Sequence, residues 1–93
     1  MDFEWDEAKS DANLARRGFD FNFATIAFLD ENRLDASART HKREQRFSVI
    51  GKVKGVILFV VYTWRFYENK KRCRIISARE ASRAERSRYS ALR

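Results

Sequence analysis

The sequence has no proline, three glycines, one cysteine and one histidine in 93 residues. A single cysteine excludes an intramolecular disulfide, and Cys73 lacks the second cysteine or nearby histidine that a metal site needs. This thiol fits a reducing compartment. The longest apolar run, VILFVVY, has seven residues, whereas a membrane span needs about 20. The N-terminus MDFEWDEAK is acidic where a signal peptide is basic, so we expect a soluble, cytoplasmic protein without membrane contacts.

Length and aromatic content indicate one domain covering residues 1–93. Domains commonly contain about 100–150 residues, so this chain has no room for two cores. Eight Phe, three Tyr and two Trp provide enough large side chains to fill a small core. We therefore expect one compact fold.

Charge is distributed unevenly along the chain. The net charge is +7: residues 1–45 carry seven Lys/Arg and ten Asp/Glu, a balance of −3, and residues 46–93 carry thirteen and three, a balance of +10. A strongly basic half is typical of proteins that bind a phosphate-rich partner, because each neutralised phosphate releases a counterion. An acidic membrane surface, an acidic protein or solubility alone are the alternatives.

The first segment predicts a short strand around Phe3 followed by a helix. Asp6 is the expected N-cap and Gly18 the residue that ends the helix in a left-handed conformation. Arg16 and Arg17 in the last turn complement the helix dipole. The expected buried stripe consists of Trp5, Ala8, Ala12 and Ala15.

The segment FDFNFATIAFLDEN fits two patterns. Its first phenylalanines alternate as in a strand, whereas Phe21, Ala24, Thr25 and Phe28 recur as one face of a helix. We predict a helix from about Asp20, capped by Asp20 or Asn22 and ended by the following acids and Asn32. RLDASARTHKREQ then predicts a short strand over residues 33–36 and a polar loop that contains His41.

Residues from Arg46 onward have the pattern of an antiparallel meander. RFSVIGKVKG alternates, Lys54 and Gly55 form a turn, and VILFVVYTWRF is apolar on both faces, as in a central strand covered on both sides. YENKK is a second turn, and RCRIISAR returns as the next strand.

The spacing of Ser82 and Glu85 is that of a capping box, which begins a last helix through Leu92. The predicted fold class is α+β, with two N-terminal helices, an antiparallel meander of three or more strands and a C-terminal helix.

Two arginines follow apolar strands where the chain leaves the core. By alternation, each continues one face of its strand: Arg65 after Phe59, Val61 and Thr63, and Arg79 after Cys73, Ile75 and Ser77. A guanidinium suits phosphate because it offers several donors in a plane and stays charged. The alternative is that both are surface arginines paired with Glu68, Glu80 or Glu85.

His41 precedes Glu44 by three residues. A base and an acid beside a basic sheet can serve RNA transesterification, in which the ribose 2′-hydroxyl loses its proton and attacks the adjacent phosphate. An incidental loop histidine is the alternative. The sequence has no P-loop, Gly-rich dinucleotide turn, nucleophile elbow or metal-ligand cluster, which argues against nucleotide, hydrolase and metal chemistry.

Four segments carry longer motifs in a fixed order. FEWDEAKSDANLARRGFDF is similar to F-x-W-D-x-x-K-x-x-x-N-x-x-K-H-G-[VI]-x-F, and EQRFSVIG to E-x-R-x-x-x-x-G. LFVVYTWR is similar to a hydrophobic strand ending Y-T-x-R, and RIISAREASRAERSRY to R-I-I-S-A-R-x-A-x-x-x-E-R-x-x-Y. These are motifs of BrnT-type toxins, which the chain resembles over nearly its whole length. The matching positions are Trp5, Asp6, Lys9, Asn13, Gly18, Glu44, Arg46, Arg65, Arg74, Arg79 and Glu85.

The resemblance implies a RelE-like fold and a ribonuclease that arrests translation in a type II toxin-antitoxin system. It also implies neutralisation by a BrnA-type ribbon-helix-helix antitoxin, with promoter DNA bound only through the complex of the two. Arg17 departs from the family pattern, which has histidine there. Either another residue acts as the base, with Glu44, His41 or Lys9 as candidates, or this position only binds phosphate.

The leading hypothesis is a metal-independent endoribonuclease without a cofactor. In it, Arg65 and Arg79 stabilise charge on the phosphate, and Glu44 or His41 moves protons. The predicted RNA-binding residues are Lys9, Asn13, Arg17 and Arg74. The alternative is a noncatalytic nucleic-acid-binding or corepressor module with a decayed active site. A third hypothesis keeps the fold but makes gyrase the target.

Overall fold

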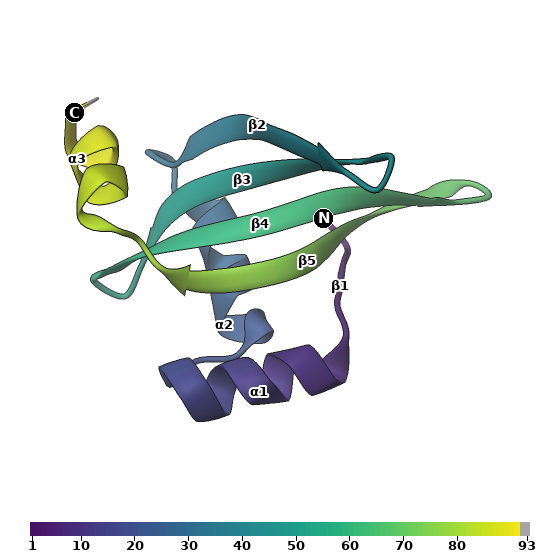
Figure 1. Ribbon diagram of the computed structural model, residues 1–93, viewed down its shortest axis with the longest axis horizontal. Helices are drawn as coiled ribbons and strands as arrows, with labels where there is room; N and C mark the ends of the chain where they lie inside the picture. The colour runs from purple at the N-terminus through teal and green to yellow at the C-terminus, as the bar shows by residue number, and fades with distance from the viewer. Residues whose placement is uncertain (92–93) are drawn as a thin grey trace.

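The computed structural model describes residues 1–91, apart from the side chains of Ser37 and Ala38. It confirms the α+β class, with helices at both ends of a meander (Figure 1). The elements are β1 (Phe3–Glu4), α1 (Glu7–Arg17), α2 (Phe21–Ala24), the 3-10 helix η1 (Thr25–Leu29), β2 (Leu34–His41), β3 (Glu44–Val53), β4 (Val56–Tyr67), β5 (Lys70–Glu80) and α3 (Arg83–Ala91).

The strands form one sheet in the order β1-β5-β4-β3-β2. Neighbours from β2 to β5 are antiparallel, whereas β1 pairs with β5 in parallel. The central position of β4 confirms the prediction from its apolar sequence. Leu58, Val60 and Tyr62 on its core face are buried, whereas Phe59 and Val61 on the other face are only partly buried.

The ends of α1 are as predicted, but its buried side is not. The Asp6 carboxylate accepts hydrogen bonds from two backbone amides of the first turn, and Gly18 ends the helix at φ 87°. The predicted stripe is wrong: Ala8, Ala12 and Ala15 are exposed, although Trp5 packs against the core. The helix buries Ser10 and Asn13 instead.

Hydrogen bonds explain the choice of these two polar residues. Ser10 Oγ accepts from the backbone N–H of Phe21 at 2.9 Å, and Asn13 Nδ2 donates to the carbonyl of Phe19 at 3.0 Å. Both partners belong to the chain that enters α2. Buried backbone groups need such partners, so α1 is held by polar contacts that hydrophobic periodicity does not detect.

The second helix begins as predicted, with the Asp20 carboxylate accepting from the Phe23 N–H. It continues as η1 and ends at Leu29, before Asn32. Its apolar side packs closely on β3. A Cβ atom at Gly51 would lie 2.5 Å from the carbonyl oxygen of Ala27, so only glycine fits there.

The prediction of a polar loop after residue 36 is wrong. β2 continues to His41 and forms a hairpin with β3, with a register shift between Ser37 and Thr40. An edge strand needs no continuous apolar face, and the irregularity interrupts the alternation, which explains why sequence pattern does not reveal this half of the strand.

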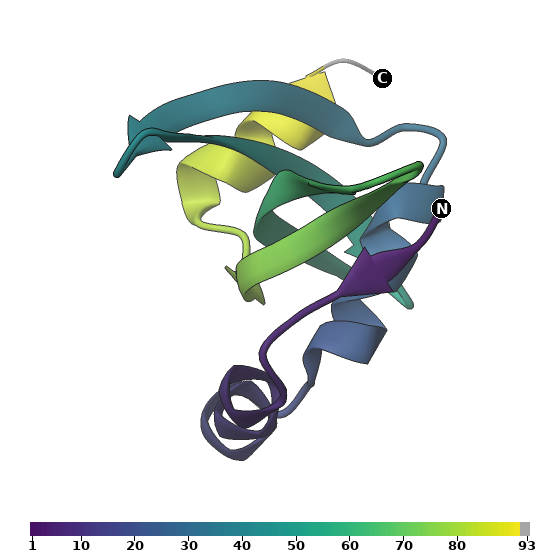
Figure 2. The same ribbon diagram turned by 90° about the vertical axis from the view of Figure 1, so that its right-hand side faces the viewer.

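The C-terminal helix confirms the capping box. Glu85 Oε1 accepts from the Ser82 N–H at 2.8 Å, and Ser82 Oγ accepts from the Glu85 N–H at 3.2 Å. The predicted end at Leu92 lies outside the described residues. Helix α3 packs Tyr89 beside Ile50, across the sheet from α1, and Figure 2 shows the two helices far apart with strands between them.

Candidate functional site

A bulge in β5 decides which face each arginine occupies. Cys73 and Ile75 pair with core residues of β4, but the register shifts after Ile75, at Ile76. Because one extra residue reverses the alternation, Arg79 lies on the opposite face from Cys73 and Ile75. The prediction that these residues share a face is therefore wrong, and Arg79 lies on the same face as Arg65.

Arginines gather on this second face of the sheet, beyond the part that α3 covers. Arg72 pairs with Arg65, and Arg74 with Thr63, in neighbouring rows. Arg46 precedes Phe47, whose partner is on the core face, so alternation directs Arg46 to the second face as well. We define the arginine cluster as Arg46, Arg65, Arg72 and Arg74.

The pairing of Arg65 with Arg72 places two positive charges directly opposite each other. Like charges at such positions are unfavourable in a sheet. The Nε of Arg46 is buried and has no hydrogen-bond partner within the described residues. The cluster therefore concentrates positive charge that a bound anion can neutralise.

Two carboxylates lie at the sides of the cluster. Glu44 Oε2 accepts from Arg65 Nε at 3.0 Å, and the Arg65 and Glu44 side chains are 41% and 29% exposed. On the other side, Arg74 donates to Glu4 at 2.9 Å, as does the Tyr67 hydroxyl. Burial would raise the pKa of Glu4, but its bonds to Arg74 and Tyr67 outweigh this and lower it.

His41 lies at the end of β2, where its Cα pairs with that of Glu44. Its side chain is exposed. The next two residues, Lys42 and Arg43, form the hairpin turn with φ of 49° and 66°. The structure thus brings His41, Glu44 and Arg65 to the same end of the second face.

Arg79 lies far from this group. It pairs with Phe59, six residues before Arg65 on β4, which is roughly 20 Å at about 3.3 Å per residue. Its terminal nitrogens donate to both oxygens of Glu85 at 2.8 and 2.9 Å, and its guanidinium stacks 4.4 Å from the Phe59 ring centroid. The hydrogen bonds raise the pKa of Arg79 and lower that of Glu85. Arg65 and Arg79 therefore cannot contact one phosphate together.

The structure does not bring the predicted residues of α1 to the cluster. Lys9 and Arg17 are exposed on the helix that packs against the opposite face of the sheet. Asn13 is 6% exposed and uses its amide inside the fold, so its predicted contact with RNA is not supported.

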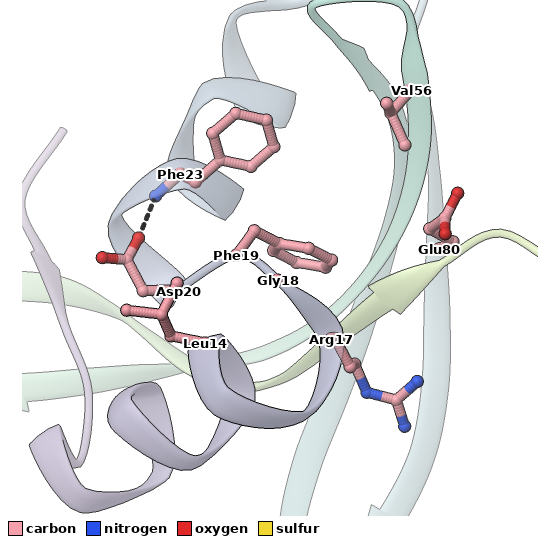
Figure 3. Close-up of a pocket in the computed structure, with 8 residues that line it drawn as sticks. All are labelled: Leu14, Arg17, Gly18, Phe19, Asp20, Phe23, Val56 and Glu80. Atoms are coloured by element: carbon pink, nitrogen blue, oxygen red, sulfur yellow. Dashed lines mark hydrogen bonds between the residues drawn. The ribbon is translucent and has the colours of Figure 1, made fainter.

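Arg17 borders an apolar hollow of about 400 Å³ beside α1 and α2. Figure 3 shows its guanidinium extending away from the rings of Phe19 and Phe23. The hollow is lined by Leu14, Arg17, Gly18, Phe19, Asp20, Phe23, Val56 and Glu80.

Sequence reasoning did not assign a site role to Arg46 or Arg72. For Arg72, the signal is the two-residue turn at Glu68 and Asn69, because a tight turn fixes the register that pairs Arg72 with Arg65. For Arg46, the sequence signal is weaker: its alternation with Phe47 indicates only that it lies on the face opposite the core.

The part of the chain that the structure describes has neither a metal-ligand cluster nor a membrane-spanning helix. Within residues 1–91, no three His, Cys, Asp or Glu side chains group closely enough to hold a metal ion. In the same range, no helix is both long and apolar enough to cross a membrane.

A family model agrees with the motifs of the sequence. The model for the ribonuclease toxin BrnT of type II toxin-antitoxin systems matches residues 5–85. The chain belongs to the BrnT family. No curated protein matches it. The match includes every residue of the arginine cluster, as well as Glu44 and Glu85.

Proposed function

We propose that the protein is an endoribonuclease toxin whose catalytic centre is formed by Arg65 of the arginine cluster and by Glu44 beside it. The observation that carries the proposal is that Arg65 binds a carboxylate through Nε while facing a second arginine, Arg72. A phosphate between the two guanidinium groups relieves their repulsion. The same phosphate then lies beside a carboxylate that can accept a proton.

The reaction is an internal transesterification. A base removes the proton of the ribose 2′-hydroxyl, the 2′-oxygen attacks the adjacent phosphorus, and the bond to the 5′-oxygen breaks. The products are a 2′,3′-cyclic phosphate and a 5′-hydroxyl, whose proton comes from a general acid or water. Arg65 stabilises the charge that develops on the phosphate oxygens, which removes the need for a metal ion.

Glu44 and His41 are the candidates for proton transfer. Glu44 contacts Arg65 directly, and its bond to Nε orients the guanidinium without using the terminal nitrogens. His41 pairs with Glu44 in the β2–β3 ladder and is exposed. One of them can act as the base and the other as the acid.

The remaining arginines bind the RNA backbone. Arg46 and Arg72 contribute charge beside Arg65, and Arg74 does so from the next row. Arg79 has a structural role in this proposal, because Glu85 holds its terminal nitrogens.

RNA cleavage by this centre would stop translation and require a neutralising partner. Family membership implies an antitoxin. We propose one of the BrnA type, with a ribbon-helix-helix domain that brings the complex to promoter DNA.

Cleavage of a generic single-stranded RNA with and without EDTA tests the mechanism. Arg65→Ala should lower the rate at least about 100-fold, as the loss of a transition-state donor does. Arg88→Ala, an exposed change on α3, is the matched control. A folded protein that does not cut RNA, or activity that EDTA abolishes, would contradict the proposal.

The second candidate function is a noncatalytic nucleic-acid-binding or corepressor module. It is based on Arg17, where the family has histidine. Arg17 lies across the sheet from the cluster, so the change does not remove a group from the proposed centre. Expression without antitoxin should arrest growth if the protein is an enzyme. The Arg65→Ala variant should not arrest growth, although it should still bind antitoxin. Arrest that persists in this variant favours another target.

A further inference from the structure

The ladder between β3 and β4 ends at the pair Phe47 and Tyr62. Beyond it, the β2–β3 and β4–β5 hairpins extend as two arms, which project to the right in Figure 1. Between them lies a hollow of about 360 Å³, within the size range of small-ligand sites. We call it the aromatic notch, and it is lined by Arg43, Glu44, Gln45, Phe47, Thr63, Trp64 and Phe66.

Aromatic rings form one side of the notch. Phe66 is 74% exposed, so most of its ring is open to solvent. Trp64 is partly buried, with the Lys71 ammonium 4.3 Å from the centroid of its ring. Phe47 stacks on Tyr62 with centroids 5.7 Å apart. The rings of Phe47 and Trp64 are held by contacts with neighbouring side chains, whereas the ring of Phe66 is open to solvent.

The notch is continuous with the proposed catalytic centre. Glu44 and Thr63 line it from the second face of the sheet, whereas alternation directs Trp64 and Phe66 to the core face. Glu44 also binds Arg65. A nucleotide whose phosphate lies on Arg65 therefore has the notch beside its base.

The turn that supplies Arg43 is strained. Lys42 and Arg43 both have left-handed φ values, 49° and 66°, which tight hairpin turns normally assign to Asn and Gly. A residue other than glycine in this conformation destabilises the fold. Lys42 and Arg43 at this tip, together with Lys70 and Lys71 on the other arm, give both hairpin ends positive charge, and Lys71 contacts the Trp64 ring.

We propose that the aromatic notch holds an unstacked base of single-stranded RNA, with Phe66 as its stacking surface. Exposed aromatic rings among cations are the usual means of binding single-stranded nucleic acid, because every base has a π-face. The inference rests on the proposed function, since it names a subsite of the same RNA. The enzyme would then require single-stranded substrate, because a paired base cannot enter the notch.

Binding of a 2′-O-methyl RNA oligonucleotide, which cannot undergo the cleavage, tests the inference directly. Phe66→Ala should weaken its binding about tenfold or more, and Phe66→Leu should also weaken it, whereas Phe66→Tyr should restore it. Leu29→Ala, at a residue 78% exposed on η1, is the matched control and should bind as the original chain does. An abasic oligonucleotide of the same length should bind Phe66→Ala and the original chain equally.

Two outcomes overturn the inference. One is unchanged binding of the 2′-O-methyl RNA by Phe66→Ala. If this variant instead loses binding to a protein antitoxin, Phe66 belongs to the antitoxin interface and the inference is wrong. The other is equal weakening with the abasic oligonucleotide, which would assign the effect to the backbone. Failure of the proposed function is distinguishable, because Arg65→Ala would then leave RNA binding and cleavage unchanged.

Discussion

Arg65 and Arg72 come from directly opposite positions of β4 and β5, so two neighbouring strands direct positive charge to the same place on the sheet. Folding alone gains nothing from this pair, because like charges across a ladder repel. The turn of Lys42 and Arg43 carries a similar cost in backbone conformation. Stability and binding are therefore expected to respond in opposite directions when these residues are changed.

Arg72→Gln should leave the free energy of unfolding unchanged or raise it by up to about 0.5 kcal/mol, because the repulsion with Arg65 disappears. RNA binding should weaken, and the slope of log K against log salt should fall by about one, since one phosphate contact is lost. Urea unfolding and binding at several salt concentrations measure both effects. A large loss of stability would contradict this interpretation of the pair.

Arg43→Gly should stabilise the protein by about 1 kcal/mol, because glycine adopts the left-handed conformation without strain. It should also weaken RNA binding through the loss of a cation at the notch. Thermal unfolding provides the first measurement and oligonucleotide binding the second. Lys54→Asn, in the β3–β4 turn at φ 48°, is the control: it should stabilise without affecting RNA binding.

Glu85→Gln should reduce the free energy of unfolding by about 1 kcal/mol at pH 7. Glutamine still fits the capping box, so the loss isolates the charge interaction with Arg79. The pKa of Glu85 is lowered from 4.5 in the folded protein, so its contribution is complete above about pH 4.5 and disappears as the pH falls through the lower folded value. Unfolding curves of the two proteins should converge in acid. A difference that is constant from pH 7 to pH 2 would exclude the ionic interaction.

Asn13→Ala should cost about 1–3 kcal/mol, because it leaves the buried carbonyl of Phe19 without its donor. Activity per folded molecule should not change. Lys9→Ala, one turn earlier and exposed, should affect neither quantity strongly. If Asn13→Ala lowers the cleavage rate of fully folded protein, the predicted RNA-binding role of Asn13 is restored.

Gly51→Ala should destabilise the protein by about 1–3 kcal/mol, because the new methyl group overlaps the carbonyl of Ala27 and forces η1 away from β3. Thermal unfolding measures the loss. Ser77→Ala, on an exposed position of β5, is expected to have little effect. A neutral result would mean that η1 shifts without cost.

The sequence predicts local features of this fold well. The caps at Asp6, Asp20 and Ser82 depend on residues within one helical turn, and the turn at Lys54 and Gly55 depends on two adjacent residues. Such signals are contained in short segments, so they can be recognised without knowledge of the tertiary structure.

Features that depend on distant contacts could not be predicted in this way. The bulge at Ile76 reverses the face of Arg79, and nothing in RCRIISAR marks it. The burial of Ser10 and Asn13 follows from hydrogen bonds to a segment six or more residues away. Arg65 and Arg79 both lie near the C-terminal ends of their strands. Because neighbouring antiparallel strands end at opposite edges of a sheet, the two arginines lie far apart.

The parallel pairing of β1 with β5 has a consequence for when the arginine cluster forms during synthesis. Glu4 meets Arg74 only when residue 74 is available, and two members of the arginine cluster also belong to β5. A nascent chain that has not yet released β5 from the ribosome therefore lacks both the complete sheet and the basic face. The arginine cluster is therefore complete only after β5 has left the ribosome and paired with β4.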